Sequence, residues 1–343
     1  MNNLSNFNIQ KELYLSNFVE DLYDADKWSL SFFFEGSNFT YVFTINWEKF
    51  YLREINERWS EENIINEVSL LNELNELSYI PKLLKISWYR NDIEIINDFM
   101  FKSWKFYYTI TKWINWEKFT NSNIELNDLW KIMWIFHNKT MNIIHKINVN
   151  DKRIKYDIKK TMFQNRSLFC YYDKSLNKSW YIENKIIENA KYIDLQIENI
   201  FCWLDWKIND LDETIIHNDL TPNNLLTYKN KIIWILDYEY ISLRENLYDL
   251  SWSIATTCYW KTKFWTLDKK KVEILVNSYF LNKWKIISNY EKEILYNFVK
   301  LWIIAAIKWT ADQYFEFWNE KIRNFERNIK LLKWLEDKNF NFL

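Results

Sequence analysis

The chain has 343 residues, enough for two domains or for one enzyme of two lobes with a buried core. Its 45 Lys and Arg residues nearly balance its 46 Asp and Glu residues, so the formal net charge is -1 and no global positive field favours nucleic acid or an anionic membrane as a partner. The 48% hydrophobic and 27% charged fractions exclude a disordered chain.

A cytoplasmic location is expected from three features. No apolar run approaches the ~18 residues of a membrane span. The first residues lack the basic and apolar regions of a secretory signal. The three cysteines are odd in number and scattered, which disfavours a disulfide framework or a zinc site. The sequence leaves the oligomeric state open.

Glycine and tryptophan have unusual frequencies. Glycine occurs once and tryptophan 21 times, whereas ordinary usage would give roughly 24 glycines. Asn46-Trp47 lies between two strand-like runs, where Asn-Gly would form a hairpin turn. A tryptophan with positive φ would be strained by roughly 1–2 kcal/mol. We hypothesise that the source reads the UGA codon as glycine; the alternative is a protein truly rich in tryptophan.

The first third of the chain favours strands. Three runs rich in aromatic and β-branched residues predict an antiparallel meander, at Ser31–Glu35, Thr40–Ile45 and Lys49–Ile55. A helix is expected after Ser60, which is a plausible N-cap. Glu67 falls in the apolar stripe of that helix, and a buried acid needs a partner.

The remainder of the chain is mainly helical. Helical spacing of apolar residues predicts helices at 124–147, 183–204, 247–258, 268–281, 289–309 and 312–336. Strands followed by helices are typical of a two-lobed α+β protein. We expect an N-terminal lobe over residues 1–112 and a C-terminal lobe over residues 113–343.

Residues 211–242 contain the side chains with the clearest chemical pattern. One apolar strand leads to His217 and Asp219, and a second ends at Asp237. Asp219 and Asn224 bracket a short loop that can direct a carboxylate at a substrate hydroxyl and an amide oxygen at a metal ion. Mg²⁺ prefers few protein oxygens together with phosphate and water. This division of labour is that of kinase-type phosphoryl transfer.

The motifs also resemble a known family. His217-x-Asp219-x-x-x-x-Asn224, followed by Asp237-Tyr238-Glu239-Tyr240 and Asp249-Leu250, resembles the aminoglycoside phosphotransferase and choline/ethanolamine kinase families, with wording closest to bacterial choline kinases. The resemblance implies a protein-kinase-like fold that uses ATP and Mg²⁺. It implies Asp219 as catalytic base, Asn224 and Asp237 as metal ligands, and His217, Glu239 and Asp249 in supporting roles.

The resemblance extends to nucleotide-binding positions in the N-terminal lobe and at the hinge. These are Gly36, Ser37 and Asn38 of the nucleotide loop, Arg53 against the phosphates, Glu67 as partner of Arg53, and Thr111 and Trp113 at the hinge that receives adenine. Glu54 and Glu73 are rival partners for Arg53. If Trp234 and Trp252 are genuine, they place bulk where such families favour small residues.

These features predict a Mg²⁺- and ATP-dependent kinase that phosphorylates a hydroxyl group of a small molecule. The favoured acceptor is choline or an ethanolamine-like alcohol. An aminoglycoside or homoserine-type phosphotransferase remains an alternative, as does a catalytically inactive nucleotide-binding scaffold. We expect neither nucleic acid nor a membrane as partner.

Overall fold

The structure is a computed structural model that describes residues 2–35, 38–55, 60–86, 94–103, 106–149, 181–204, 207, 211–259, 266–317 and 322–337. The chain forms two compact units. The first comprises Met1–Glu117 and Ile233–Glu239, and the second comprises Lys118–Ile232 and Tyr240–Leu343. The short segment with Asp237 and Glu239 therefore belongs with the N-terminal residues.

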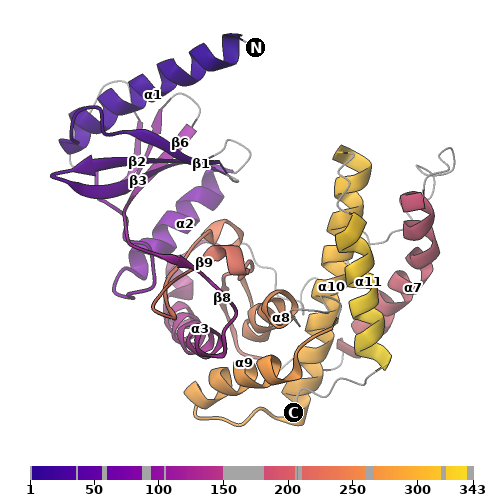
Figure 1. The fold of residues 1–343 in the computed structure, drawn as a ribbon. Helices are drawn as coiled ribbons and strands as arrows, with labels where there is room; N and C mark the ends of the chain where they lie inside the picture. The colour runs from indigo at the N-terminus through magenta and orange to yellow at the C-terminus, as the bar shows by residue number, and fades with distance from the viewer. Residues whose placement is uncertain are drawn as a thin grey trace. The chain divides into compact units, whose positions relative to one another are not determined.

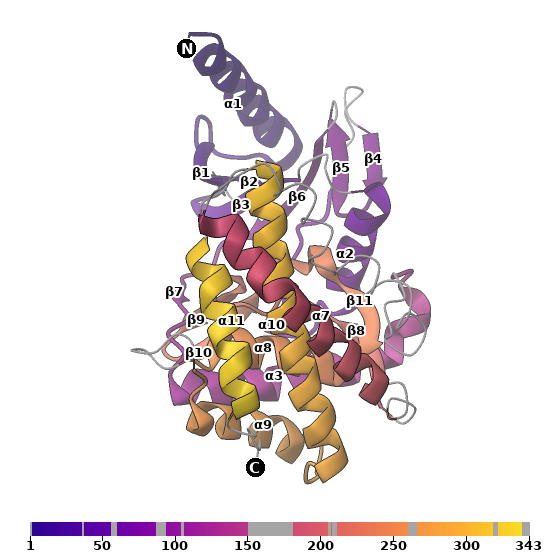
Figure 2. The same cartoon turned by 90° about the vertical axis from the view of Figure 1, so that its right-hand side faces the viewer.

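The first unit is built on a six-stranded antiparallel sheet of order β1-β2-β3-β6-β5-β4. Figure 1 labels β1, β2, β3 and β6, and Figure 2 labels all six strands. Its strands are β1 Ser31–Glu35, β2 Phe39–Ile45, β3 Glu48–Ile55, β4 Glu94–Asn97, β5 Met100–Ser103 and β6 Phe106–Lys112. The expected meander over the first three strands is present. β3 and β6 pair directly, so residues on these two strands share the central part of the sheet.

Two helices cover opposite faces of this sheet. α1 (Asn2–Tyr23) packs Phe18 and Val19 against one face, while α2 (Glu61–Glu73) packs Ile64 and Val68 against the other. The Ser60 side chain accepts a hydrogen bond from the backbone N–H of Asn63, so it caps α2 as expected. The sequence analysis did not anticipate α1.

A buried ion pair fastens α1 to the sheet. Lys11 Nζ lies 2.5 Å from Glu54 Oε1, and the Glu54 side chain is fully buried. The Tyr108 hydroxyl also donates to Glu54, at 3.1 Å. Because its carboxylate faces α1, Glu54 is committed to Lys11 rather than to Arg53.

The second unit is mainly helical. Its long helices are α3 Asn123–Ile143, α7 Tyr181–Leu204, α8 Asn246–Thr257, α9 Lys269–Asn282, α10 Asn289–Phe317 and α11 Ile322–Asp337. α3 packs against α9, and α10 packs against α7, α8 and α11; Figure 2 shows α7, α10 and α11 side by side. The expected break near residue 310 is wrong: α10 continues because no proline interrupts it and Ala311 extends its buried face.

Short strands hold the polar segment of residues 211–242. β8 (Glu213–Ile216) pairs antiparallel with β11 (Ser242–Glu245). A three-stranded sheet has the order β10-β9-β7, in which β10 is Lys231–Ile235, β9 is Leu225–Tyr228 and β7 is Glu117–Lys118. A single 3-10 turn, Pro222–Asn224, leads into β9.

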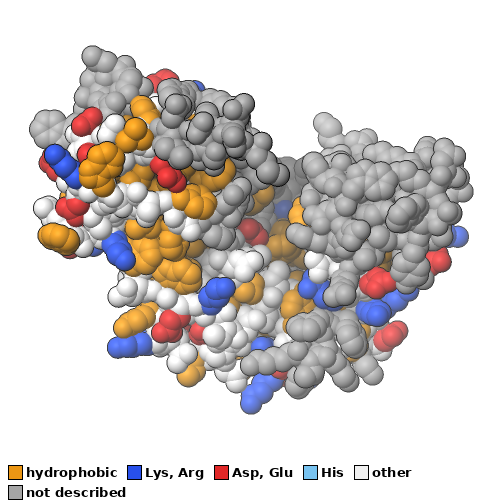
Figure 3. Space-filling model, turned by 45° about the horizontal axis from the view of Figure 1, so that its top comes forward, with side chains coloured by type: hydrophobic (Ala, Val, Ile, Leu, Met, Phe, Trp, Pro, Cys, Tyr) orange, Lys and Arg blue, Asp and Glu red, His pale blue; other side chains and the backbone are white. Residues whose placement is uncertain are grey.

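Two further features of the fold are the distribution of charge on its surface and the burial of its most apolar helix. On the face shown in Figure 3, basic and acidic side chains of the described residues are interspersed rather than gathered by sign. Among the described helices, one stretch, Asn289–Ala311, is long and apolar enough to cross a membrane, but 61% of its most apolar window is buried inside the fold. It therefore has the burial of a core helix.

Candidate functional site

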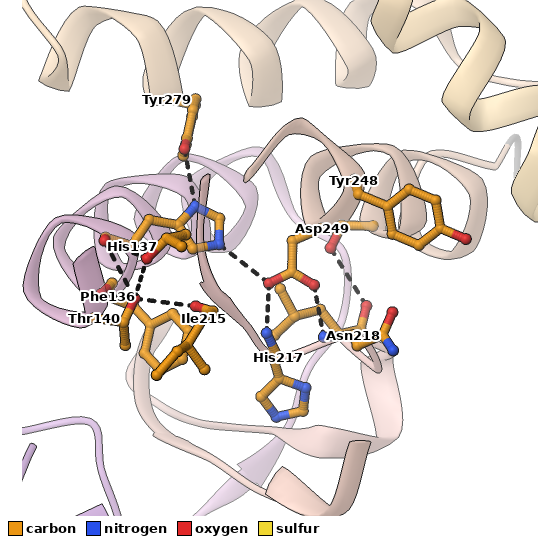
Figure 4. Close-up of polar contacts among 12 residues, drawn as sticks. Phe136, His137, Thr140, Ile215, His217, Asn218, Tyr248, Asp249 and Tyr279 are labelled. Atoms are coloured by element: carbon orange, nitrogen blue, oxygen red, sulfur yellow. Dashed lines mark hydrogen bonds and ion pairs between the residues drawn. The ribbon is translucent and has the colours of Figure 1, made fainter. Parts of the chain in front are cut away.

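The loop after β8 is held by a carboxylate from α8. The backbone N–H groups of His217 and Asn218 donate to Oδ2 and Oδ1 of Asp249, each at 2.8 Å (Figure 4). Asp249 is fully buried, in the first turn of α8. Since each of its oxygens receives a backbone donor, the buried charge is compensated and the direction of the loop is set.

A histidine of α3 completes this anchor. His137 of α3 lies with Nε2 3.1 Å from Asp249 Oδ2 and Nδ1 2.8 Å from the Tyr279 hydroxyl of α9. Burial raises the pKa of Tyr279 well above its usual value, and the charges of Asp212, Asp249 and Glu291 raise it further. Because a carboxylate only accepts, Nε2 carries the proton and Nδ1 accepts from the phenol. A chain of hydrogen bonds thus connects α9 and α3 to Asp249 of α8, which holds the loop.

The loop brings Asp219 and Asn224 together. The amide nitrogen Nδ2 of Asn224 donates to the backbone carbonyl of Asp219 at 2.8 Å and to its Oδ2 at 2.9 Å. His217 Nδ1 accepts from the backbone N–H of Asp219 at 3.2 Å, so the buried imidazole braces the loop from beneath. Both hydrogens of the Asn224 amide are therefore directed at Asp219, which leaves its Oδ1 oxygen for a different ligand.

In the first unit, Arg53 gathers three carboxylates. Its Nη1 lies 2.6 Å from Glu67 Oε1, and its Nη2 lies 2.6 Å from Glu239 Oε1 and 3.4 Å from Asp237 Oδ1. The amide of Asn38 also donates to Glu239. The acid in the apolar stripe of α2 thus has Arg53 as its partner, while Glu54 has Lys11.

This group carries an excess of negative charge. Burial raises the pKa of Glu67, and Arg53 offsets part of that rise. Burial also raises the pKa of Glu239 to about 7, with Arg53 opposing and Asp237 and Glu67 adding to the rise. Burial alone would lower the pKa of Arg53, but Glu67, Glu239 and Asp237 raise it overall. One guanidinium faces three carboxyl groups, so negative charge exceeds positive charge when all three are ionised.

An aromatic surface lies on the same face of β3 as Arg53. Tyr51 and Arg53 are two residues apart on one strand, so their side chains leave the same face of the sheet. The Tyr51 ring stacks on Trp113, with centroids 4.6 Å apart and 22° between the planes. Phe33 meets Trp113 edge-on at 5.5 Å. Tyr51 was not among the residues predicted from the sequence, although its spacing from Arg53 could have indicated it.

The remaining residues predicted for the nucleotide loop and the hinge are placed as follows. Thr111 lies in β6 opposite Tyr51, and the backbone N–H of Trp113 donates to the carbonyl of Lys49 at 2.9 Å. Gly36 and Ser37 lie outside the described residues. The structure thus groups the predicted residues within each unit: Asn38, Arg53, Glu67, Asp237 and Glu239 in the first, and His217, Asp219, Asn224 and Asp249 in the second.

The sequence matches a family model over residues 30–271, well over half of the chain: that of the phosphotransferase enzyme family. The chain belongs to this family. It is therefore a phosphotransferase, as the motifs of the catalytic loop led us to expect. No curated protein sequence matches it.

Solved structures of phosphotransferases and small-molecule kinases share its fold. A spectinomycin phosphotransferase in complex with ADP and spectinomycin is 12% identical, with a TM-score of 0.64 over 96% of each chain. Plasmodium vivax ethanolamine kinase is 12% identical, with a TM-score of 0.57 over 93% of this chain and 84% of that one. Choline kinase from Cryptosporidium parvum Iowa II is 15% identical, with a TM-score of 0.55 over 90% of each chain.

At these identities the likeness concerns the fold. It confirms the prediction of a protein-kinase-like α+β protein with an antiparallel sheet in its N-terminal part and a mainly helical C-terminal part. Nucleotides accompany several of these relatives, ADP in one and GDP in another.

Proposed function

We propose that this phosphotransferase is a Mg²⁺- and ATP-dependent kinase that phosphorylates the hydroxyl group of choline or an ethanolamine-like alcohol. The observation that carries the proposal is the contact between Asp219 and Asn224 on a loop fastened by Asp249. A half-buried carboxylate beside an amide, on a loop with little freedom to move, is what transfer to a hydroxyl requires.

Asp219 is the base and orienting group for the acceptor. Its carboxylate accepts the hydrogen bond of the acceptor hydroxyl and takes the proton as the oxygen attacks the terminal phosphorus of ATP. The phosphorus–oxygen bond to ADP breaks on the opposite side. His217 and Asp249 act on this step through the position of the loop rather than by touching the reacting atoms.

Arg53 is the phosphate-binding cation of the nucleotide site. It lies on a central strand, its direction is fixed by Glu67, and it shares a face of the sheet with Tyr51, against which the base of a nucleotide can stack. Asn38 belongs to the same group through Glu239. Nucleotide phosphates would engage a guanidinium whose orientation is already fixed.

The donor atoms fit Mg²⁺. Asn224 has a carbonyl oxygen not engaged by Asp219, and Asp237 belongs to the cluster in which negative charge exceeds positive charge. Among the described residues no group of three or more His, Cys, Asp or Glu side chains is arranged to hold a metal ion by itself. When bound, Mg²⁺ neutralises charge on the phosphates.

The choice of acceptor rests on the two motifs around Asp219 and Asp237, whose residues most resemble those of bacterial choline kinases. Ethanolamine and choline kinases are among the structural relatives, and so are a spectinomycin phosphotransferase and a protein solved in complex with GDP and kanamycin. An aminoglycoside or homoserine-type acceptor is therefore the second candidate, and an inactive nucleotide-binding scaffold is the third. We place the enzyme in the cytosol, acting on a free small molecule without nucleic acid or a membrane.

The test is a phosphorylation screen with Mg²⁺-ATP across amino alcohols, aminoglycosides and hydroxy amino acids. Wild type should phosphorylate a choline- or ethanolamine-like compound, and Asp219→Asn should lose about 10²–10⁴-fold in turnover while binding ATP normally. Lys231→Gln, at an exposed position on β10, is the matched control and should keep full activity. Equal turnover in Asp219→Asn would refute the assigned base, and phosphorylation confined to another compound class would refute the acceptor.

A further inference from the structure

Three tryptophans have backbone conformations that favour glycine. Among the described residues, ten non-glycine residues have positive φ. Six of the ten are Asn or Asp, the side chains that tolerate this region best. One is Lys229, and the other three are Trp28 (φ 59°), Trp47 (φ 67°) and Trp284 (φ 52°). A bulky side chain in this region is an outlier, and three of one type call for a common cause.

Trp47 occupies the glycine position of a two-residue hairpin. Asn46 and Trp47 connect β2 to β3, with Ile45 opposite Glu48, and both have positive φ. That is the type I′ geometry, for which Asn-Gly is the preferred pair. The hexapeptide Ile-Asn-Trp-Glu-Lys-Phe occurs at 45–50, where it includes this turn, and again at 114–119. The copy at 114–119 adopts no such turn, so the hairpin rather than the local sequence requires the conformation.

Trp28 occupies the third position of a tight turn. The backbone N–H of Ser29 donates to the carbonyl of Asp26 at 3.0 Å, which closes a four-residue turn with Lys27 and Trp28 in the middle. Only the second of these two central residues has positive φ. This is the pattern of a type II turn, which favours glycine at that position.

Trp284 terminates α9 in the Schellman arrangement. The backbone N–H of Lys285 donates to the carbonyl of Phe280, and that of Trp284 donates to the carbonyl of Leu281, each at 3.1 Å. Lys283 is the C-cap, so Trp284 is the residue after it, the left-handed position that glycine usually fills.

Burial does not stabilise the indoles at these three positions, and the packing of another tryptophan pair is also unfavourable. Trp28, Trp47 and Trp284 are 74%, 92% and 96% exposed, so their rings gain almost no burial. Inside the second unit, the rings of Trp252 and Trp302 have centroids 3.7 Å apart at a 45° tilt, closer than the roughly 4.5–7 Å of ordinary aromatic pairs. The buried Nε1 of Trp252 has no hydrogen-bond partner among the described residues. Smaller residues would relieve both the backbone strain at the three turns and the crowding of Trp252 against Trp302.

We propose that the protein made in its source carries glycine at positions 28, 47 and 284, as it would if the UGA codon were read as glycine there. Three separate motifs, a hairpin, a turn and a helix end, each place a tryptophan where the backbone favours a residue without Cβ. The single glycine and 21 tryptophans of the sequence fit the same substitution throughout the chain.

Peptide mass spectrometry of the protein isolated from its source decides the identity. One tryptic peptide, residues 28–49, contains both Trp28 and Trp47, and a protease that spares lysine reports position 284. Glycine masses at these positions are expected. A tryptophan mass at any of the three overturns the proposal.

Thermal unfolding of recombinant variants tests the backbone cause independently. Trp28→Gly, Trp47→Gly and Trp284→Gly should each raise the Tm, by about 2–4 °C. Trp309→Gly is the matched control, because Trp309 is half exposed but lies inside α10 without positive φ, and there glycine should lower the Tm. A lowered Tm in all four variants would show that no backbone strain exists at the three turns, which also overturns the proposal.

Discussion

The Asp249 carboxylate holds His217 through the backbone, not through the imidazole: Oδ2 accepts the His217 N–H at 2.8 Å. The imidazole points elsewhere and accepts from the backbone of Asp219 through Nδ1. One carboxylate and one ring thus fix consecutive parts of the same loop, and both set the direction of Asp219, the proposed base.

Replacing Asp249 should therefore damage turnover more than substrate binding. Asp249→Ala leaves two buried N–H groups and the Nε2–H of His137 without an acceptor, so we expect a loss of about 3–5 kcal/mol in stability. Asp249→Asn keeps the shape and one oxygen, so it should fold and show a lowered kcat with little change in the KM for ATP. Steady-state kinetics with urea unfolding measures both effects.

Tyr279→Phe is the graded companion of this prediction. It removes only the hydrogen bond between the Tyr279 hydroxyl and His137, so we expect a loss of about 1 kcal/mol in stability and a smaller decrease in kcat.

If Asp249→Asn raised the KM for ATP while kcat stayed constant, Asp249 would not be acting through the catalytic loop.

The Glu239 carboxyl should give the nucleotide-free, metal-free protein a distinctive pH dependence. Its pKa is about 7 in the folded protein against an ordinary 4.5, because of burial and then the charges of Asp237 and Glu67, with Arg53 opposing. Between these values the folded state binds more protons than the unfolded state, so the free energy of unfolding should fall as pH rises from about 4.5 to 7. The loss should be on the order of 1–3 kcal/mol.

Chemical denaturation at a series of pH values, with EDTA present, measures this slope. In Glu239→Gln the contribution of this carboxyl is gone, so the unfolding free energy should depend less on pH over the same interval. Absolute stabilities need not match, since the variant also loses a charge beside Arg53; the comparison is of slopes. Parallel curves for the two proteins would contradict a raised pKa at this position.

The N-terminal helix depends on a pair that sequence spacing could not reveal. Lys11 and Glu54 are separated by 43 residues, and Glu54 is fully buried on the sheet. Lys11→Met leaves that carboxylate without its cation, so we expect a loss of about 3–5 kcal/mol, whereas Lys11→Met with Glu54→Gln should recover most of it. A double-mutant cycle by thermal unfolding isolates the coupling. Strictly additive losses would mean that the pair does not hold α1.

Short-range sequence patterns predicted the features that depend on neighbouring residues. The meander of β1 to β3, the Ser60 cap and the loop from His217 to Asn224 were all evident from short-range spacing, because period and capping are encoded within a few residues. The pairing of Arg53 with Glu67 rather than Glu54 could not be decided that way, since all three lie in one stretch and the choice is made by Lys11 from α1.

The contacts of His137 show the same limit. Nothing near it in sequence indicates that it reaches Asp249, because the two are 112 residues apart and meet only when α3 and α8 pack around β8. The break predicted near residue 310 was wrong for a different reason. Ala311 continues the buried face of α10, and no local signal ends the helix there.

The identity of the residue at position 113 can be tested against the proposed nucleotide binding. The Trp113 indole stacks on one face of the Tyr51 ring, on the side of the sheet that bears Arg53. If a nucleotide base stacks on Tyr51, Trp113→Gly should uncover that ring and lower the Kd for ATP, while Tyr51→Leu should raise it in either background, by about 1–3 kcal/mol. Phe43→Leu, in the core on the α1 side, is the matched aromatic control and should leave the Kd unchanged. Titration calorimetry with ATP measures the wild type and these four variants, and an affinity insensitive to both Trp113 and Tyr51 would remove the base from this face of the sheet.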